Sequence, residues 1–249
     1  VGINPANLAV YNTASWNIID FSFGLSNNYF SINNYNTLSG AHLNDDSDPN
    51  HYPQDQMLNK FGGIGLRLKQ SINFPLPGLN MSKNQFAFSS KIISNLDIGL
   101  SDGIVQFFFT GNPYQEDIDL NIEEIFYLTQ EIGFSYGHSF TGFSAGFTIK
   151  YLAGLFYMGM ESIGNPTLTT DINGIHGIAQ YMLRQDIGGG GIGLDLGILT
   201  DEFDDGFRFG LSIINLFGTI DWSQTSFLRK IVILLKEVTL LIINFCLIK

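Results

Sequence analysis

The stretch Gly188 to Gly193 has the spacing of a phosphate-binding turn. In a dinucleotide-binding fold, a G-x-G-x-x-G turn joins a strand to a helix, and an acidic residue follows about 20 positions later. Here the next residues, Leu194 to Ile198, alternate apolar with polar or glycine positions, which predicts a strand rather than a helix. We therefore expect these glycines to let a strand bend and to let neighbouring groups approach it closely.

A second chemical motif, Gly142 to Gly146, has the G-x-S-x-G spacing of a hydrolase nucleophile. That chemistry needs a sharp turn from strand to helix that exposes Ser144, whereas the alternation here continues to Tyr151. A serine on the polar face of a strand is the favoured interpretation, so we do not expect an enzyme. A barrel lipase that uses Ser144 with His138 or His176 is the alternative.

The spacing of histidine, aspartate and cysteine does not support a metal site. None of the histidines has H-E-x-x-H or paired ligand spacing; they are His42, His51, His138 and His176. The acidic stretch from Asp46 begins like a calcium loop, but its sixth and twelfth positions are His51 and Met57, where that loop needs Gly and Glu. The single cysteine, Cys246, cannot form an internal disulfide or a multi-cysteine site. We expect neither a metal nor another cofactor.

Composition indicates that part of the surface does not face water. Only 14% of the 249 residues are charged, whereas 45% are hydrophobic, including 22 phenylalanines. Average soluble domains carry about a quarter charged residues. The net charge of −11 and the 12 scattered basic residues argue against nucleic acid as a partner.

The elements that must carry these residues are strands, because apolar side chains recur with a period of two from Trp16 onward. Seven segments show the alternation clearly: 16–27, 63–74, 85–92, 124–137, 143–154, 192–198 and 207–213. Two weaker candidates are 28–35 and 177–184. About nine strands joined by turn residues indicate an all-β barrel or sandwich.

Two features favour a barrel in a membrane over one in water. The polar face of the strands consists largely of Gly, Ser, Asn and Thr with isolated Arg and Lys, as expected of a barrel lumen. Aromatic residues gather near strand ends, where membrane barrels carry interfacial girdles. The sequence therefore predicts an antiparallel transmembrane β-barrel whose apolar face meets lipid.

Two segments depart from the strand pattern. Residues 101–112 begin with capping residue types, carry Ile104, Phe107 and Phe108 at helical spacing and end in Gly-Asn, which predicts one short internal helix. We consider this helix a candidate plug of the lumen. Residues 43–56 predict a long polar loop that protrudes.

Charged residues on the polar face are the candidate determinants of selectivity in a lumen. They are Arg67, Lys69, Lys91, Lys150, Asp195 and Arg208. In the last hairpin, pairing of Leu199 with Gly206 would place Asp195 diagonal to Arg208, within reach of long side chains. We therefore expect an internal ion pair between these two residues.

Three stretches together resemble a known group of proteins. They are "GINPANLA", "INFPLPGLNMSKNQFAFSSKIISNLD" with "FFFTGN", and "GGGGIGLDLGILTDEFDDGFRFGLSIINLFGTIDW". In these stretches the chain resembles an uncharacterised family of outer-membrane barrels from Bacteroidota-type bacteria, which is similar to the FadL-like fatty-acid porins and to the PorV group. The resemblance covers 2–222 and implies a place in the bacterial outer membrane, but it implies no substrate and no catalytic residue. Members continue with further strands, so we expect an incomplete barrel here.

These observations divide the chain into a barrel domain, 1–226, and an atypical apolar tail, 227–249. The longest charge-free run of the tail, 238–248, is shorter than the roughly 20 residues of a spanning helix. A non-homologous end and an authentic amphipathic helix are both open interpretations.

We expect the protein to be a channel or transporter for small or hydrophobic molecules, with the lipid bilayer and a small hydrophobic ligand as partners. The alternative is a non-transporting scaffold for a secreted or surface protein, as the resemblance to the PorV group allows. Its contacts would come from the loop 43–56 and the acidic turn 201–205.

Overall fold

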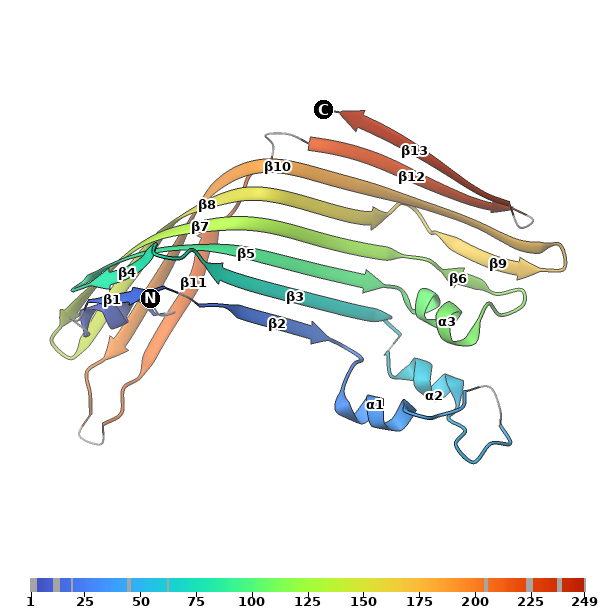
Figure 1. Cartoon of the computed structure of the whole chain (residues 1–249), viewed down its shortest axis with the longest axis horizontal. Helices are drawn as coiled ribbons and strands as arrows, with labels where there is room; N and C mark the ends of the chain where they lie inside the picture. Colours follow the sequence, from blue (N-terminus) through green and yellow to red (C-terminus); the bar gives the residue numbers. More distant parts are fainter. Residues whose placement is uncertain are drawn as a thin grey trace.

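The computed structural model describes residues 4–10, 14–18, 20–43, 46–61, 63–203, 206–222, 226–236 and 239–248, with backbone alone at 226, 234–236 and 239–248. Within these residues, thirteen strands join one antiparallel sheet (Figure 1). The strands are β1 (Ser15–Asn17), β2 (Ser22–Asn27), β3 (Leu66–Pro75), β4 (Asn80–Lys83), β5 (Phe86–Leu100), β6 (Asp117–Asp119), β7 (Ile122–Phe140), β8 (Phe143–Ser162), β9 (Thr167–Asp171), β10 (Gly174–Thr200), β11 (Gly210–Gly218), β12 (Ser226–Lys236) and β13 (Thr239–Ile248). The helices are the 3-10 helix η1 (Pro5–Ala9), α1 (Ile32–Leu38), α2 (Gln54–Asn59) and α3 (Asp102–Thr110).

Four long neighbouring strands, β5, β7, β8 and β10, form the middle of the sheet. Shorter strands lie end to end along them: β3 and β4 both pair with β5, while β11 and β12 both pair with β10. One edge ends in β1 and β2, and the other ends in β11 and β13. In the described part of the chain these edges do not pair, so the antiparallel strands are confirmed but the sheet is open.

The sheet bends where β8 and β10 each carry one residue more than β7. Ile187 pairs with Phe156 and Gly189 pairs with Gly154, which leaves Gly188 and Leu155 between matched pairs. The pairing of β8 with β7 shifts by one residue at this point. Gly188 has φ +78°, a conformation that suits glycine, and its bulge reverses the alternation of side chains along β10. The glycine-rich stretch therefore bends a strand, as its sequence predicts, and Figure 1 shows the resulting curve.

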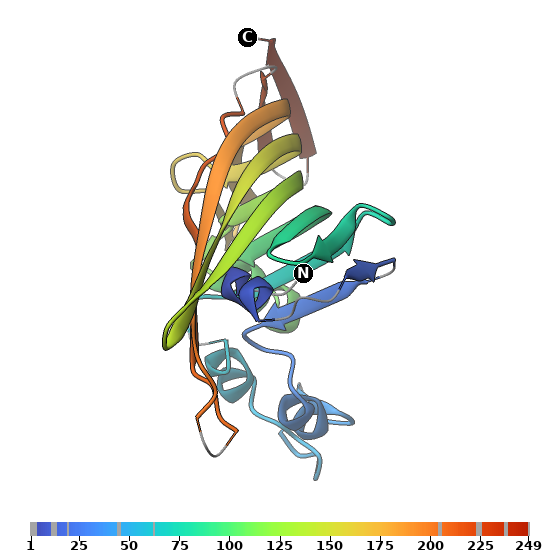
Figure 2. The ribbon, with the colours of Figure 1, turned by 90° about the vertical axis from the view of Figure 1, so that its left-hand side faces the viewer.

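The two faces of the sheet have opposite chemistry. The face that carries Ile192 and Phe217 is apolar and exposed, at 69% and 58% respectively, whereas Lys150 on the other face is only 1% exposed. Figure 2 shows that the sheet curls around η1, so the polar face is the concave one. Exposed side chains of the apolar face are Phe23, Leu25, Phe74, Phe86, Phe134, Ile149, Tyr151, Ile187, Ile192, Ile198, Leu211 and Phe217.

The predicted internal helix is confirmed as α3, but the described residues also contain η1, α1 and α2, so the prediction of a single helix is wrong. The hydroxyl of Ser101 caps α3 by accepting a hydrogen bond from the backbone N–H of Ile104. Residues 28–35, a weak strand candidate, instead contain the start of α1, which the Ser31 hydroxyl caps in the same way. Helices of six or seven residues are too short to reveal a helical period. For α1 the available signal was its capping serine, Ser31.

The strand expected over 16–27 is divided into β1 and β2, which pair with different strands. In the tail, β12 and β13 form a hairpin, and β12 pairs with β10 along eleven residues from His176 to Asp186. The amphipathic helix considered for 227–249 is therefore wrong for the described residues. No helix in the described part is long and apolar enough to cross a membrane.

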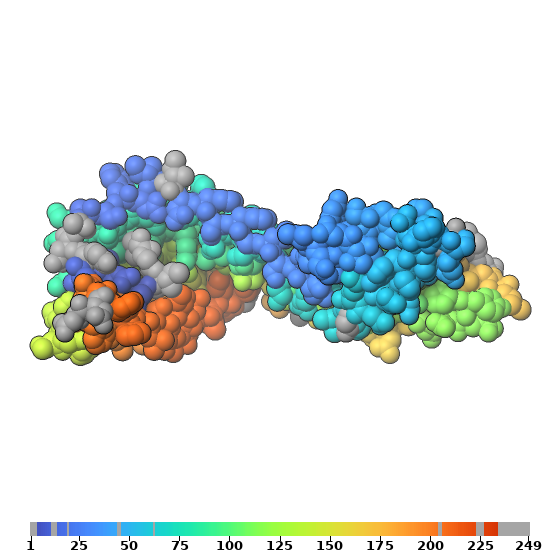
Figure 3. Space-filling model, turned by 90° about the horizontal axis from the view of Figure 1, so that it is seen from below, coloured from blue at the N-terminus to red at the C-terminus, as the bar shows by residue number. Residues whose placement is uncertain are grey.

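The helices α1 and α2 lie beyond the ends of β2 and β3, where Figure 3 shows them gathered at one end of the molecule. The loop expected over 43–56 is shorter than predicted, because α2 begins at Gln54; Asn44 and Asp45 lie outside the described residues. The carboxylate of Asp48 organises this loop by accepting a hydrogen bond of 2.7 Å from the N–H of Asn50. It also lies 2.6 Å from Nδ1 of His42.

We expect this loop to loosen in acid. The hydrogen bond from Asn50, followed by the contact with His42, holds the pKa of Asp48 below its ordinary value of 3.8. Because the folded-state pKa is the lower one, the stabilisation is present above pH 3.8 and is lost as the pH falls through the lowered pKa. Hydrogen-exchange protection of the Asn50 amide should fall over that range. In Asp48→Asn the acid-dependent fall should be absent, and protection in the wild type that is unchanged by acid would contradict the prediction.

Candidate functional site on the polar face

A cluster of charges that is buried at Glu131, Lys150 and Asp195 lies near the middle of the polar face. We call it the buried charge cluster: Lys91, Glu131, Lys150, Asp195 and Asn215. The Nζ atom of Lys150 lies 2.6 Å from Oδ1 of Asp195, 3.6 Å from Oε2 of Glu131 and 2.5 Å from Oδ1 of Asn215. Lys91 Nζ lies 3.1 Å from the other carboxylate oxygen of Glu131. Two lysines face two carboxylates, so the cluster carries no formal net charge.

Strand register and one irregularity of β11 assemble this cluster. Lys150 pairs with Gly133 on β7 and with Gly193 on β10, and neither neighbour has a side chain that would occupy the space of the lysine. The register between β10 and β11 shifts beyond Leu194. Within this irregularity Asn215 adopts φ +53°, and its N–H donates to Asp195 over 2.8 Å. The cluster thus connects β5, β7, β8, β10 and β11.

The helix η1 lies in a seat of three glycines on the polar face. A Cβ atom at Gly137, Gly146 or Gly197 would come within 2.8, 2.5 or 2.0 Å of atoms in the segment from Asn4 to Ala9. The Asn4 side chain caps η1 by accepting from the N–H of Ala6, and its Nδ2 donates to carbonyls of β10 and β11. Glycine is therefore needed here for close approach.

A second group of glycines lies under the segment that follows β11. We call residues Thr219–Trp222 the crossing segment. A Cβ atom would lie 1.7 Å from the Thr219 carbonyl oxygen at Gly191, and 2.6 Å from the Trp222 ring at Gly154. Gly190 exchanges backbone hydrogen bonds with Asp221. The stretch that resembled a phosphate-binding turn thus accommodates the protein's own backbone.

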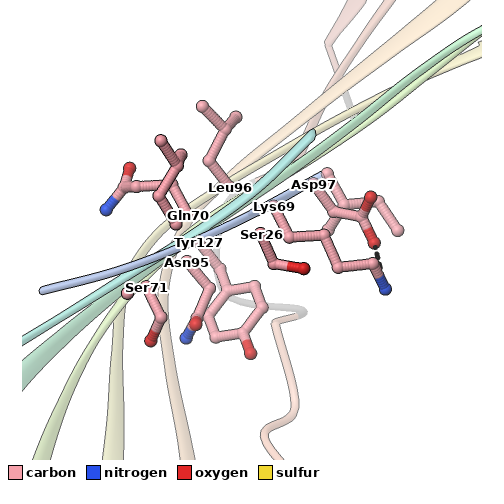
Figure 4. Close-up of a pocket in the computed structure, with 11 residues that line it drawn as sticks. Ser26, Lys69, Gln70, Ser71, Asn95, Leu96, Asp97 and Tyr127 are labelled. Atoms are coloured by element: carbon pink, nitrogen blue, oxygen red, sulfur yellow. Dashed lines mark ion pairs between the residues drawn. The ribbon is translucent and has the colours of Figure 1, made fainter. Parts of the chain in front are cut away.

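A third polar group lies on β3 and β5. The Arg67 guanidinium donates two hydrogen bonds, of 2.8 and 3.1 Å, to the carboxylate of Asp97, and Lys69 Nζ lies 3.1 Å from the same carboxylate. Arg67 also approaches Glu123 at 3.5 Å. A hollow beside Lys69 and Asp97 is shown in Figure 4.

Five of the six charged residues predicted to share the polar face do so: Arg67, Lys69, Lys91, Lys150 and Asp195. The predicted pair of Asp195 with Arg208 is wrong. Leu199 pairs with Gly210 and not with Gly206, so the hairpin loop is four residues longer on that side. Arg208 lies in this loop, 2.8 Å from Glu202. The groups that contact Asp195 are the ammonium of Lys150 and the backbone N–H of Asn215. Asp204 and Asp205 of the acidic turn lie outside the described residues.

The candidate plug α3 lies at the end of the sheet beside β6 and α2. Its Ile104 is buried, whereas Phe107 and Phe108 are 40% and 76% exposed. The element found against the polar face is η1 instead, near the end of the sheet where β7 turns into β8. Its sequence signal was Asn4 followed by Pro5, since asparagine is a favoured helix cap and proline is favoured at the first helical position.

The structure does not bring together the residues named for the barrel-lipase alternative. Ser144 is buried on the polar face, where its hydroxyl lies 3.0 Å from that of Ser139. His138 pairs with Ala145 and so lies on the apolar face, while His176 contacts Asp171 at the far end of β10. Among the described residues, no group of three or more His, Cys, Asp or Glu side chains is arranged to hold a metal ion.

Comparison with known proteins adds a family but no activity. No curated protein and no solved structure gave a match. A family model described as a family of unknown function, DUF5723, matches residues 5–186, which include η1, the glycines beneath it at 137 and 146, and most of the buried charge cluster. Since the match covers more than half of the sequence, this chain belongs to the DUF5723 family.

Proposed function

We propose that the chain forms the wall of an outer-membrane β-barrel that serves as a channel for small molecules, with η1 closing its interior. The observation that carries the proposal is the inside-out distribution of side chains. Lys150 and Asp186 are buried on the concave face, while aromatic and aliphatic residues are exposed across the convex face. A soluble β-protein buries its apolar face, whereas a membrane barrel turns that face to lipid and keeps polar residues inside.

The lengths of the central strands are compatible with this proposal. A strand needs about 9–11 residues to cross a bilayer when it is tilted. The strands β5, β7, β8 and β10 have 15, 19, 20 and 27 residues, so each can cross and extend beyond the membrane. The open edges would then be joined by further strands, as the resemblance to FadL-like and PorV proteins implies.

One substitution on each surface tests the membrane proposal. Ile192 belongs to the apolar face and Ile172 to the turn between β9 and β10; both are exposed, at 69% and 83%. Lysine on a lipid-facing strand costs about 2–4 kcal/mol near the bilayer midplane and little outside it. Ile192→Lys should therefore lower the yield of membrane-inserted, heat-modifiable protein, and Ile172→Lys should not. Wild-type protein found wholly in the soluble fraction would refute the proposal.

A second candidate function is a scaffold for a secreted or surface protein. The observation that favours it is that the protein's own chain, η1 and the crossing segment, covers the glycines of the polar face. Planar-bilayer recordings separate the two functions. A channel should conduct, more so once η1 is displaced, whereas a scaffold should give no conductance in either form.

A further inference from the structure

A hollow on the polar face lies between β2, β3, β5 and β7, and none of its lining residues belongs to η1 or the buried charge cluster. Its volume is about 490 Å³, within the range of roughly 300–1,000 Å³ that is usual for small-molecule sites. Figure 4 shows Ser71, Asn95 and Tyr127 on one side of the strands, with Lys69 and Asp97 beside them. The hollow is therefore lined by hydroxyl, amide, charged and aromatic groups together with the apolar residues Leu25, Leu96 and Ile125.

Strand register aligns the lining groups in one row across the sheet. Gly24 pairs with Ser71, Ser71 with Asn95, and Asn95 with Tyr127. Tyr127 in turn pairs with Tyr157, whose ring centroid lies 5.6 Å from that of Trp222. Aromatic surface thus continues from the hollow toward the crossing segment.

Several polar groups in the hollow are free to bind a ligand. The hydroxyls of Ser26, Ser71 and Tyr127 and the amide of Asn95 form no hydrogen bond with another side chain or backbone group in the described part of the protein. An apolar ligand would remove these groups from water without replacing their hydrogen bonds, at a cost of about 1–3 kcal/mol for each. Because Leu25, Leu96 and Ile125 also line the hollow, it favours a ligand that combines donors and acceptors with an apolar face.

The charges beside the hollow compensate one another. Asp97 pairs with both Arg67 and Lys69, and Arg67 also approaches Glu123, so two cations face two anions. An anionic ligand would find no surplus of positive charge and would have to compete with these carboxylates. The hollow thus favours a neutral ligand.

We propose that this hollow binds a neutral pyranose ring. Equatorial and axial hydroxyls of a sugar can both donate and accept, which matches the serine, asparagine and tyrosine groups, while its apolar C–H face can pack on the ring of Tyr127. Lys69 and Asp97 would orient hydroxyls at the rim. The inference rests on the proposed function, because it takes the polar face as the path along which a solute moves.

Calorimetric titration of the full chain with maltose tests the inference. The protein is held in an amine-oxide detergent, because detergents with sugar headgroups would compete. We expect saturable binding of maltose, weaker binding of its carboxylate analogue maltobionate, and no competition by decanoate. Absence of saturable maltose binding, or tighter binding of maltobionate or decanoate at this site, would overturn the inference.

Variants on the two faces of the sheet locate the binding. Tyr127→Ala removes the ring from the hollow and should weaken maltose binding roughly three- to tenfold, as the loss of one aromatic contact implies. Asn95→Ala should weaken it as well and supplies a second test if Tyr127→Ala does not fold. Tyr151→Ala, on the apolar face, should leave the affinity unchanged. Equal effects of Tyr127→Ala and Tyr151→Ala would contradict the assignment.

Membrane fractionation before detergent extraction, with heat-modifiable migration on a gel, separates this inference from the proposed function. Protein that inserts and is heat-modifiable but does not bind maltose refutes the sugar site alone. Protein that remains soluble refutes the proposed function, whatever its affinity for maltose.

Discussion

Replacing Lys150 with methionine is expected to destabilise the protein by about 3–5 kcal/mol, the usual cost of removing one partner from a buried ion pair. Methionine retains much of the lysine stem but leaves Asp195 without its cation at 2.6 Å and Glu131 with Lys91 alone. The side chains of Glu131 and Asp195 are only 9% and 13% exposed, so water cannot replace the ammonium group without a rearrangement. The free energy of unfolding by urea in detergent micelles is the measurement.

Two further variants make this prediction specific to the buried charge cluster. Adding Asp195→Asn to Lys150→Met removes the uncompensated carboxylate and should recover part of the lost stability. Lys69→Met is the matched control, because Lys69 pairs with Asp97 at 3.1 Å but its side chain is 58% exposed. An exposed pair contributes less than about 1 kcal/mol. Equal losses for Lys69→Met and Lys150→Met would contradict the role given to burial.

Replacing Gly146 with leucine is expected to expel η1 from the polar face. A Cβ atom at this position would lie 2.5 Å from the carbonyl carbon of Pro5 and 2.7 Å from the nitrogen of Ala6, and backbone atoms cannot yield as a flexible side chain can. The hydrogen bonds from Asn4 to the carbonyls of Ile198 and Leu211 would be lost together with the contact. Hydrogen exchange of the peptide 4–10 should become fast, with protection falling at least tenfold for a loss of about 1.4 kcal/mol.

Gly190→Ala is the matched control for this prediction. Its Cβ would meet only the Tyr151 hydroxyl at an ordinary 3.5 Å, so η1 should stay protected. If the chain is a channel, Gly146→Leu should also raise single-channel conductance, whereas Gly190→Ala should not. Fast exchange without a change in conductance would support the packing of η1 on the three glycines but argue against the proposal that η1 closes the channel. Unchanged exchange would refute the seat itself.

Most of the strands and their faces could be predicted from the sequence, because away from a bulge such as that at Gly188 a side chain's face depends on alternation within its own strand. The polar face of Arg67 and Lys69, and the strand nature of the stretch after Gly193, follow from that local rule. The capped helix α3 was also predictable, since its cap and period are local.

What only the tertiary structure decided was which groups meet. The sequence predicts Asp195 beside Arg208 on an assumed tight turn, whereas the longer loop carries Arg208 away and the register of β8 with β10 places Lys150 beside Asp195. Nothing local places the residues Asn4 to Ala9 on glycines more than 120 positions away. Register and close approach between distant segments depend on the whole sheet, because each pair of strands fixes the position of the next. The alternating sequence therefore determined a β-sheet with one polar and one apolar face, and tertiary structure determined what lies against the polar face.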